Sequence, residues 1–257
     1  MLEVKDVRWV VRSGSGRKTI LDSVSISVER GKTLGLVGES GSGKSSLAKC
    51  VAGLIKPTSG SIRIDGQDYT GGRRMGPELL HMVMQDSLAS MNPRLTIAEV
   101  VAEPFICAKR GNTQAARLHA GEWLERVGIP ERQWDRYPHA LSGGQRQRVN
   151  IARALSLRPK MLIADEPVSA LDVSIQASVL NLLMQLQRDE KFSCLFITHS
   201  LPVVNVIADD VAVMSGGRIV DVGPVATVIE NPRDDYTKRL IAAVPHLDLT
   251  PTPISAD

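Results

Sequence analysis

The sequence predicts an α/β fold: a mixed β-sheet flanked by helices, with an N-terminal antiparallel β-subdomain and an inserted α-helical subdomain. Strand and helix patterns alternate along most of the chain, residues 2–38 contain almost only strand patterns, and a charged helical block at 87–157 interrupts the alternation. We therefore expect a core made of residues 1–86 and 158–245, with the helical subdomain inserted between its two parts. A Pro- and Thr-rich tail, residues 246–257, is expected to be poorly ordered.

The elements before the helical block follow from apolar patterning and turn residues. Alternation and Gly-containing turns predict five strands, over residues 2–11, 20–29, 33–38, 60–66 and 79–85. Leu47, Val51 and Leu54 recur at helical spacing and predict a helix over residues 43–55. The block itself is expected to contain helices over 96–110, 114–128 and 140–155.

Strand signals return after Pro159. Short apolar runs predict strands over 160–167 and 194–199, and Gly216-Gly217 closes a hairpin over 211–223. Helical patterns separate these strands, over residues 173–189 and again from residue 201.

The composition is that of an ordinary globular protein with well-mixed charges. The 257 residues are 43% hydrophobic and carry a net charge of +3, which is too small an excess to favour nucleic-acid binding. Cys50, Cys107 and Cys194 are scattered without metal-ligand spacing and indicate buried thiols in a reducing compartment. The charged N-terminus predicts no secretory signal, and no apolar run approaches the roughly 18 residues that span a bilayer. We expect a cytosolic protein unless a partner recruits it to a membrane.

The stretch "GESGSGKS", residues 38–45, fits the phosphate-loop pattern G-x-x-x-x-G-K-[ST] between a predicted strand and a predicted helix. Glycines let backbone N–H groups curl around phosphates, Lys44 reaches the outer phosphates, and the Ser45 hydroxyl is offered to Mg²⁺. A flexible glycine turn is the simpler alternative, and the flanking strand and helix argue against it. The expected nucleotide-binding residues here are Gly38, Ser40, Gly41, Gly43, Lys44, Ser45 and Ser46.

A second part of a nucleotide site is predicted at "MLIADE", residues 161–166. An apolar strand that ends in acids is usually only a strand that meets solvent, but the phosphate loop changes this balance. Asp165 is then expected to hold Mg²⁺, and Glu166 to activate the attacking water.

Three more polar residues lie at strand ends or in tight loops. Gln85 ends one apolar strand, His199 ends another, and Asp172 closes the "SALD" segment after the acids. A histidine after a strand is more often structural than catalytic. Because neighbouring parallel strands end at one edge of a sheet, His199 and Glu166 are expected to meet in one crevice.

A second phosphate-facing helix start precedes the basic helix "ALSGGQRQRVNIARAL". Ser142 and Gln145 stand at capping-box spacing, and Gly143 and Gly144 lie between them. Such an end attracts phosphate. The sequence alone does not explain why one chain carries two of them.

These motifs together resemble the ATP-binding-cassette (ABC) ATPases. "GESGSGKS", Gln85, "LSGGQ" at 141–145, "LIADEP", "SALD" and "ITH" occur in that family's order and spacing, over nearly the whole chain. The resemblance implies an ATPase that uses ATP and Mg²⁺, with Gln85 as a further Mg²⁺ ligand and catalytic residue beside Glu166 and His199. It also implies a head-to-tail dimer, in which residues 142–145 cap the ATP held by the partner cassette and Asp172 lies at the shared site.

Three longer stretches narrow the resemblance. "QDSLASMNPRLTIAEVVAEP", "DEPVSALDVSIQA" and "NPRDDYTKRLIAAVP" look like the importer ATPases for dipeptides, oligopeptides and nickel. That group implies membrane permease subunits, an extracytoplasmic substrate-binding protein and a place at the cytoplasmic face of the bacterial inner membrane. A second ATPase subunit is also implied, more often a different one than a copy. The cargo is left open among dipeptides, oligopeptides, opines, glutathione, nickel and metallophores.

The chain departs from the family pattern at three places. Val11 stands where an aromatic residue usually stacks on adenine, and Trp9, two residues away, is the alternative. Ser200 replaces an aspartate common after the histidine. The cysteine-rich segment that many peptide-type members carry near their C-terminus is not found here, so no iron–sulfur cluster is expected.

Other functions compete with the transporter hypothesis. A soluble cassette that acts on DNA or in translation usually carries coiled-coil, zinc or second-cassette insertions, and this sequence shows none of them. An accessory ATPase of phosphonate breakdown stays open as an alternative. A pure binding module is disfavoured because Glu166 and His199 are both present.

Overall fold

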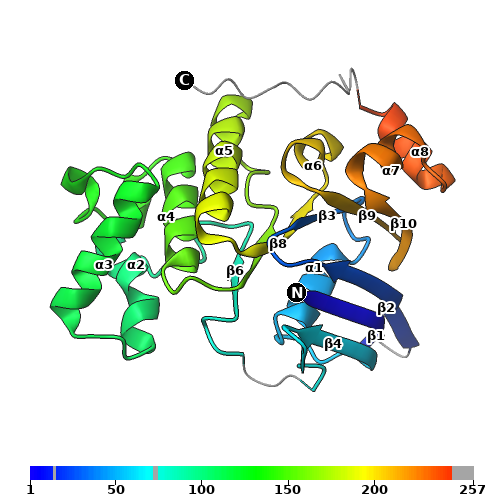
Figure 1. Ribbon diagram of the computed structural model, residues 1–257, viewed down its shortest axis with the longest axis horizontal. Coiled ribbons are helices and arrows are strands. Elements are labelled where there is room, and N and C mark those ends of the chain that lie inside the picture. Colours follow the sequence, from blue (N-terminus) through cyan, green and yellow to red (C-terminus); the bar gives the residue numbers. More distant parts are fainter. Residues whose placement is uncertain (14–15, 72–74, 245–257) are drawn as a thin grey trace.

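A six-stranded mixed sheet forms the centre of the protein, and the computed structural model describes residues 1–13, 16–71 and 75–244 (Figure 1). The strand order is β10-β9-β3-β8-β7-β6, and all neighbours are parallel except β9 and β10. Every residue of β3, β7 and β8 is buried, as expected for strands covered on both faces. The strands span Thr33–Val37 (β3), Leu80–Val83 (β6), Met161–Asp165 (β7), Ser193–Thr198 (β8), Asp210–Ser215 (β9) and Arg218–Pro224 (β10).

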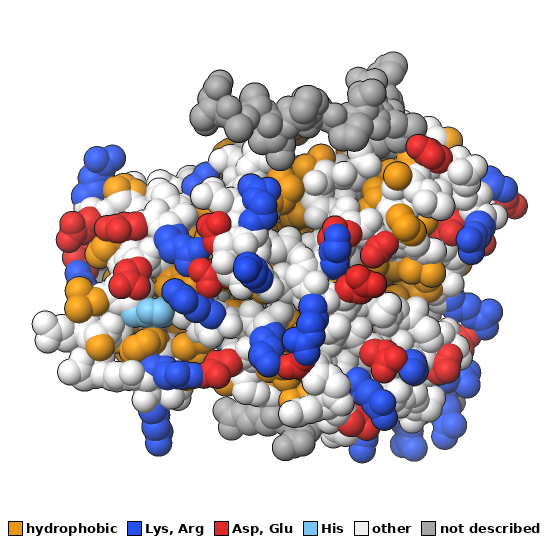
Figure 2. All heavy atoms as spheres, in the orientation of Figure 1, with side chains coloured by type: hydrophobic (Ala, Val, Ile, Leu, Met, Phe, Trp, Pro, Cys, Tyr) orange, Lys and Arg blue, Asp and Glu red, His pale blue; other side chains and the backbone are white. Residues whose placement is uncertain are grey.

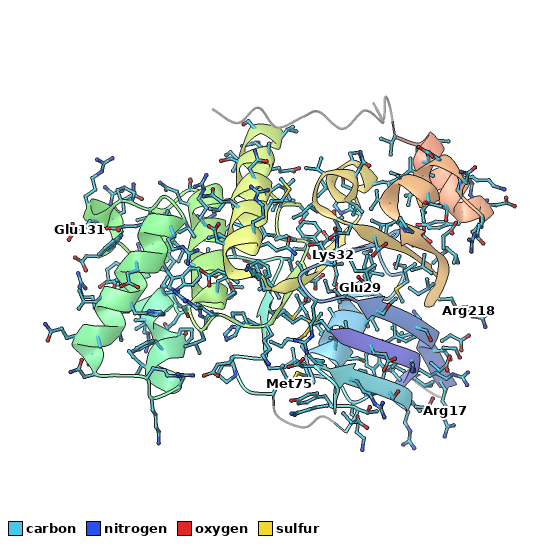
Figure 3. All side chains as sticks on the ribbon, viewed as in Figure 1. Arg17, Glu29, Lys32, Met75, Glu131 and Arg218 are labelled. Carbon is cyan, nitrogen blue, oxygen red and sulfur yellow. The ribbon has the colours of Figure 1, made fainter. Side chains whose placement is uncertain are left out.

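A separate antiparallel sheet is formed by the N-terminal part of the chain, in the order β2-β1-β4-β5. One face packs on helix α1 and the central sheet, so that Leu2 and Val4 share a buried cluster with Leu47 and Ile163. The other face carries charged side chains, and Figure 3 shows Arg17 projecting from its outer edge. The elements span Leu2–Ser13 (β1), Gly16–Val28 (β2), Ser59–Ile64 (β4), Gln67–Asp68 (β5) and Lys44–Val51 (α1).

Three helices gather on one side of the central sheet, at the left of Figure 1. They span Ile97–Cys107 (α2), Thr113–Arg126 (α3) and Gly143–Leu155 (α4), with short 3₁₀ turns at Glu131–Gln133 and Pro138–Ala140. A side chain at the N-terminus of each helix accepts a hydrogen bond from a free backbone N–H group. Thr96 forms a capping box with Glu99 at α2, Asn112 caps α3, and Ser142 forms a capping box with Gln145 at α4. The interior is apolar around fully buried Trp123.

The remaining helices cover the sheet and its far end. Helix α5 (Val173–Glu190) and helix α6 (Leu201–Ile207) follow β7 and β8, and α7 (Val225–Glu230) and α8 (Asp235–Ala242) follow β10. In the part of the chain that the structure describes, no helix is both long and apolar enough to cross a bilayer.

The predicted fold class is confirmed, with differences in individual elements. Helix α1 ends at Val51 instead of Ile55, because Gly53 takes a left-handed conformation (φ 71°) and turns the chain, which leaves Leu54 67% exposed. Strand β6 ends at Val83, so Gln85 lies beyond the strand. Helices α7 and α8 were not expected. Cys107, predicted to be a buried thiol, is exposed at the end of α2, whereas Cys50 and Cys194 are buried. The predicted tail lies outside the described residues.

Candidate active site

The loop of residues 38–45 connects buried strand β3 to helix α1. Its glycines are required by its geometry. Gly43 caps α1 with φ 110°, and a Cβ atom there would lie 3.0 Å from the Ile20 carbonyl oxygen. A Cβ atom at Gly38 would lie 2.1 Å from the carbonyl oxygen of Met214. Only glycine fits both positions, because a side chain at either would collide with backbone atoms of β2 or β9.

Lys44 lies under this loop, with only 5% of its surface exposed. Its Nζ atom donates hydrogen bonds to the carbonyl oxygens of Gly38 (2.7 Å) and Glu39 (2.9 Å). Burial lowers the pKa of Lys44, and the charges of Glu166 and Asp165 oppose this shift. Among the residues that the structure describes, the buried Ser42 hydroxyl has no hydrogen-bond partner. A buried ammonium and an unpartnered hydroxyl fit a loop built to receive phosphate. Ser40 is exposed and Ser46 is half-buried in the first turn of α1.

Two oxygen atoms suited to Mg²⁺ lie together beside the loop. The Ser45 hydroxyl donates a hydrogen bond to Asp165 Oδ1 at 3.1 Å. Burial raises the pKa of Asp165, and the Ser45 hydrogen bond lowers it in part. Across residues 1–13, 16–71 and 75–244, no group of three or more His, Cys, Asp or Glu side chains could hold a metal. A hydroxyl and a carboxylate oxygen are ligands that Mg²⁺ accepts alongside waters and phosphate oxygens, so the chemistry of the Ser45–Asp165 pair fits that ion.

Residues that follow the ends of three strands come together at the Glu166 carboxylate. Gln85 Nε2 lies 3.3 Å and His199 Nδ1 lies 3.4 Å from the same oxygen, Glu166 Oε2. The reason is topological: β6, β7 and β8 are adjacent and parallel, so the residues after their ends share one edge. Glu166 has a left-handed backbone (φ 47°), and its N–H donates to the Ile197 carbonyl at 2.9 Å. Such strain is a common feature of functional sites. Within the described chain, Gln85 makes no hydrogen bond with Ser45 or Asp165.

The "LSGGQ" segment forms the capping box that its spacing predicts. The Ser142 hydroxyl accepts from the Gln145 N–H at 3.3 Å, and Gln145 Oε1 accepts from the Ser142 N–H at 3.1 Å. A Cβ atom at Gly144 would lie 2.5 Å from Ile175 Cγ2, so this glycine also lets α4 approach α5. None of residues 142–145 hydrogen-bonds to the phosphate loop or to Glu166 of the same chain, as far as the described residues extend. A single chain does not bring the two phosphate-facing starts together.

Two other predicted contacts are not assembled in the single chain. Asp172 precedes α5 without a capping side-chain hydrogen bond. Val11 pairs with Lys18 across the antiparallel sheet, whereas Trp9 pairs with Leu21 and packs on the core. These strand pairings do not identify which of the two side chains would stack on adenine.

The loop after Gln85 is hydrogen-bonded to helix α4 through two residues that the sequence motifs do not predict. Asn150 Nδ2 donates to the Ser87 carbonyl (3.0 Å), and Arg153 donates to the Ser90 carbonyl (2.6 Å) and to the Glu103 carboxylate (2.6 Å). The sequence signal for Asn150 and Arg153 is a polar residue on the inward side of a basic helix. That signal does not predict which group the residue contacts.

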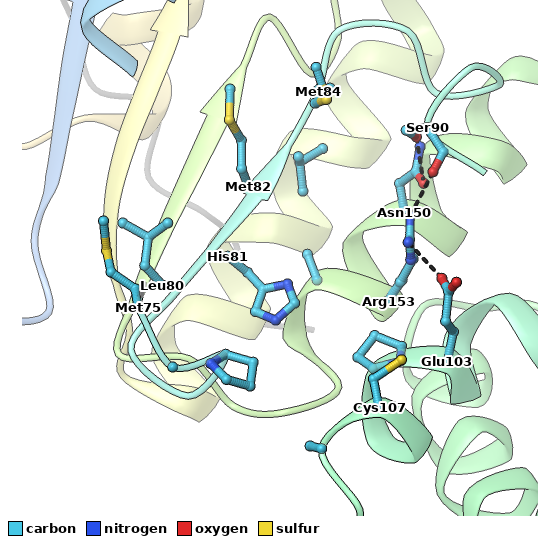
Figure 4. A pocket seen from close by; sticks show the side chains of 16 residues that line it. Met75, Leu80, His81, Met82, Met84, Ser90, Glu103, Cys107, Asn150 and Arg153 are labelled. Atoms are coloured by element: carbon cyan, nitrogen blue, oxygen red, sulfur yellow. Dashed lines mark hydrogen bonds and ion pairs between the residues drawn. The ribbon is translucent and has the colours of Figure 1, made fainter. Parts of the chain in front are cut away.

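A groove of about 950 Å³ lies next to this loop, between β6, α2 and α4 (Figure 4). Met75, Met82 and Met84 line it together with His81. Burial and the nearby Arg153 charge lower the pKa of His81 to about 4, so the ring is neutral near pH 7. On the face drawn in Figure 2, acidic and basic side chains are interspersed. The groove itself combines apolar and polar walls.

The chain is similar to known proteins in both sequence and fold. A family model described as ABC transporter matches residues 21–169. The oligopeptide transport ATP-binding protein OppF of Lactococcus lactis is 41% identical over 97% of this chain and 82% of its own length. The di/tripeptide transport ATP-binding protein DppF of Pseudomonas aeruginosa is 45% identical over 93% of this chain and 75% of its own length. The dimeric structure of MJ0796, a bacterial ABC transporter cassette, superimposes with a TM-score of 0.80 at 28% identity, over 88% of this chain and 99% of that one.

Proposed function

Because the chain belongs to the ABC transporter family as one of its ATPases, we propose that it powers the uptake of peptides through a separate permease. The observation that carries the proposal is the meeting of Gln85 and His199 at Glu166, beside the Ser45–Asp165 pair. We propose that the core consists of residues 1–86 and 158–245 and that residues 87–157 form the moving subdomain.

The proposed chemistry assigns a task to each part of this site. The loop around Lys44 holds the phosphates of ATP, and Glu166 accepts a proton from the attacking water. Ser45, Asp165 and Gln85 would hold Mg²⁺, which would supply positive charge to the phosphate oxygens. His199 positions the terminal phosphate and the water, which its distance of 3.4 Å from Glu166 supports.

His199→Ala is therefore expected to keep ATP affinity and lose most turnover. The ring is 55% exposed, so its removal does not open the core. His199→Gln is the matched variant, because its amide restores a hydrogen-bonding group of similar reach and should recover part of the rate. Steady-state hydrolysis and direct nucleotide binding measure the two quantities. Full turnover in the alanine variant would make His199 a structural residue.

A second ATPase subunit would complete the site. We propose that Ser142, Gly143, Gly144 and Gln145 face the ATP held by that subunit, with Asp172 at the same interface. The dimeric arrangement of the related cassette MJ0796 supports this pairing. In this pairing the N-terminus of α4, the second phosphate-facing helix start of this chain, would face the ATP phosphate held by the other subunit.

The groove between β6, α2 and α4 is the proposed docking place for a permease helix. Ser90, Glu103 and Pro104 of the segment after Gln85 line it, and methionine side chains adapt well to an apolar partner. Asn150 and Arg153 tie the loop after Gln85 to α4, which begins at the "LSGGQ" segment. A rotation of α4 on ATP binding would therefore move the docked helix.

We propose that the chain works as a peripheral subunit at the cytoplasmic face of the plasma membrane, and that an extracytoplasmic protein delivers the cargo. The names of both relatives described above favour a peptide cargo over nickel or a metallophore. They equally favour transport over a role in phosphonate breakdown or on DNA.

Cysteine crosslinking to the co-expressed permease tests the transport function. Cys107 is exposed and lines the groove, so it must first be replaced by serine. Cys50 and Cys194 can stay, because burial raises the pKa of their thiols to about 11 and about 12 and keeps them unreactive. Single cysteines at the exposed positions Leu88, Ala89 and Arg94 should then crosslink to the permease, to a different extent with and without ATP.

A cysteine at Val222 is the matched control, because this residue is 50% exposed on β10, away from the groove. It should form no crosslink. If the cysteines at positions 88, 89 and 94 also form none while ATP hydrolysis is intact, the transport proposal fails and a soluble cassette becomes the better hypothesis.

A further inference from the structure

The C-terminal helix α8 contacts the phosphate loop directly. Tyr236, in the first turn of α8, accepts a hydrogen bond on its hydroxyl oxygen from the backbone N–H of Glu39, at 2.8 Å. The two residues are 197 positions apart in the sequence. None of the roles assigned above uses this contact.

Helix α8 is held in place independently of the loop. The Asp221 carboxylate of β10, only 5% exposed, accepts from the N–H groups of Arg233 (2.8 Å) and Asp234 (3.2 Å). The Asp234 side chain in turn caps α8 by accepting from the Tyr236 N–H at 2.7 Å. Tyr236 is thus presented by an anchored helix and not by a loose tail.

The same apolar cluster supports both the helix and the strand that leads into the loop. Tyr236, Leu240 and Ile241 pack against a buried group that includes Val37, the last residue of β3. Gly38 follows directly. The distance between α8 and the start of the loop is therefore fixed by packing.

One peptide group of the loop is held from both sides. The carbonyl oxygen of Gly38 and the N–H of Glu39 belong to the same peptide unit. Lys44 Nζ binds the oxygen at 2.7 Å, and the Tyr236 hydroxyl binds the N–H at 2.8 Å. Peptide groups next to glycine rotate easily, because glycine tolerates a wide range of backbone angles. A partner on each side prevents that rotation.

We propose that Tyr236 is a positioning residue for ATP binding, which fixes the orientation of the Gly38–Glu39 peptide group. The need for it arises when ATP is bound. Lys44 must then share its three N–H donors with phosphate oxygens, whereas the Tyr236 hydroxyl keeps its hold on the peptide. This inference rests on the proposed role of residues 38–45 as the phosphate loop.

Tyr236→Phe removes the hydroxyl and keeps the ring that packs on the cluster. Loss of one neutral hydrogen bond is expected to raise the Kd and KM for ATP about 2- to 10-fold. The value of kcat at saturating ATP should stay within about 2-fold, since the lost contact is to the Glu39 N–H and not to Glu166, the proposed general base. Titration calorimetry without hydrolysis gives the Kd, and thermal unfolding without nucleotide reports any loss of structure.

Tyr69→Phe is the matched control. Its hydroxyl also makes one hydrogen bond, to Gln67 at 3.1 Å, far along the antiparallel sheet, and its loss should leave the Kd unchanged. An unchanged Kd in Tyr236→Phe, or an equal rise in both variants, overturns the inference. So does a lower melting temperature with normal ATP affinity, because that is the result of a purely structural contact.

Lys44→Ala separates this inference from the proposed function on which it rests. Loss of a charged hydrogen-bond donor to phosphate should weaken ATP binding by about 10- to 150-fold. Lys56→Ala removes the same charge from an exposed position beyond α1 and should bind ATP normally. If Lys44→Ala binds ATP normally, the phosphate-loop assignment fails. If Lys44→Ala binds ATP weakly but Tyr236→Phe binds it normally, only the positioning role of Tyr236 fails.

Discussion

Replacing Glu166 by glutamine is expected to slow ATP hydrolysis by about 10²- to 10⁴-fold, while ATP still binds. Glutamine keeps the size of the side chain and its hydrogen bond with Gln85 or His199, but it cannot accept the proton of the attacking water. Single-turnover hydrolysis measures the rate, and retention of labelled ATP on the protein measures binding.

The control is Glu230→Gln, which removes the same charge from an exposed residue at the end of α7 and should hydrolyse ATP at the parent rate. A parent-like rate in Glu166→Gln would transfer the role of general base to another group. His199 would then be the first candidate, because its Nδ1 atom lies 3.4 Å from the same carboxylate.

Replacing Ser142 by aspartate is expected to lower the affinity of ATP-driven pairing between two cassettes by about 10²-fold or more. Aspartate caps a helix as well as serine does, so α4 remains intact. Its negative charge, however, would face the terminal phosphate held by the partner, and such a like-charge contact costs several kcal/mol. Light scattering in the Glu166→Gln background measures pairing, for the chain alone and with a co-expressed second ATPase.

Ser142→Asn keeps the cap without the charge and should still pair. ATP binding to the separate subunit should be normal in both variants. Pairing by Ser142→Asp at the parent affinity would argue against the proposed face of the dimer. Gly144 is a poor place for this test, because any side chain there would collide with Ile175 of the same chain.

The sequence predicted those parts of the site that follow from strand order alone. Glu166 and His199 each follow an apolar strand, and adjacent parallel strands must deliver them to one edge. Lys44 and Ser45 were predictable from the phosphate-loop pattern, because its spacing leaves few other conformations.

The remaining parts depend on contacts that no local pattern encodes. The partner of Asn150 is a backbone carbonyl 63 positions earlier, and that of Tyr236 is a backbone N–H 197 positions earlier. Leu54 fitted the helical period and is nevertheless exposed, because the turn at Gly53 overrides periodicity. Hydrophobic patterning reports which face of an element is buried, but it does not report what lies against it.

The strand order also has a consequence for synthesis on the ribosome. Within the described part of the chain, strand β3, which leads into the phosphate loop, has only β8 and β9 as sheet neighbours, and both are made more than 150 residues after it. A nascent chain that already contains residues 38–45 therefore lacks both strands that hold the loop in place, and contacts this distant in sequence form late. Nucleotide binding should consequently begin only after β9 has left the exit tunnel, so that ATP cannot act as an early folding aid for the N-terminal half.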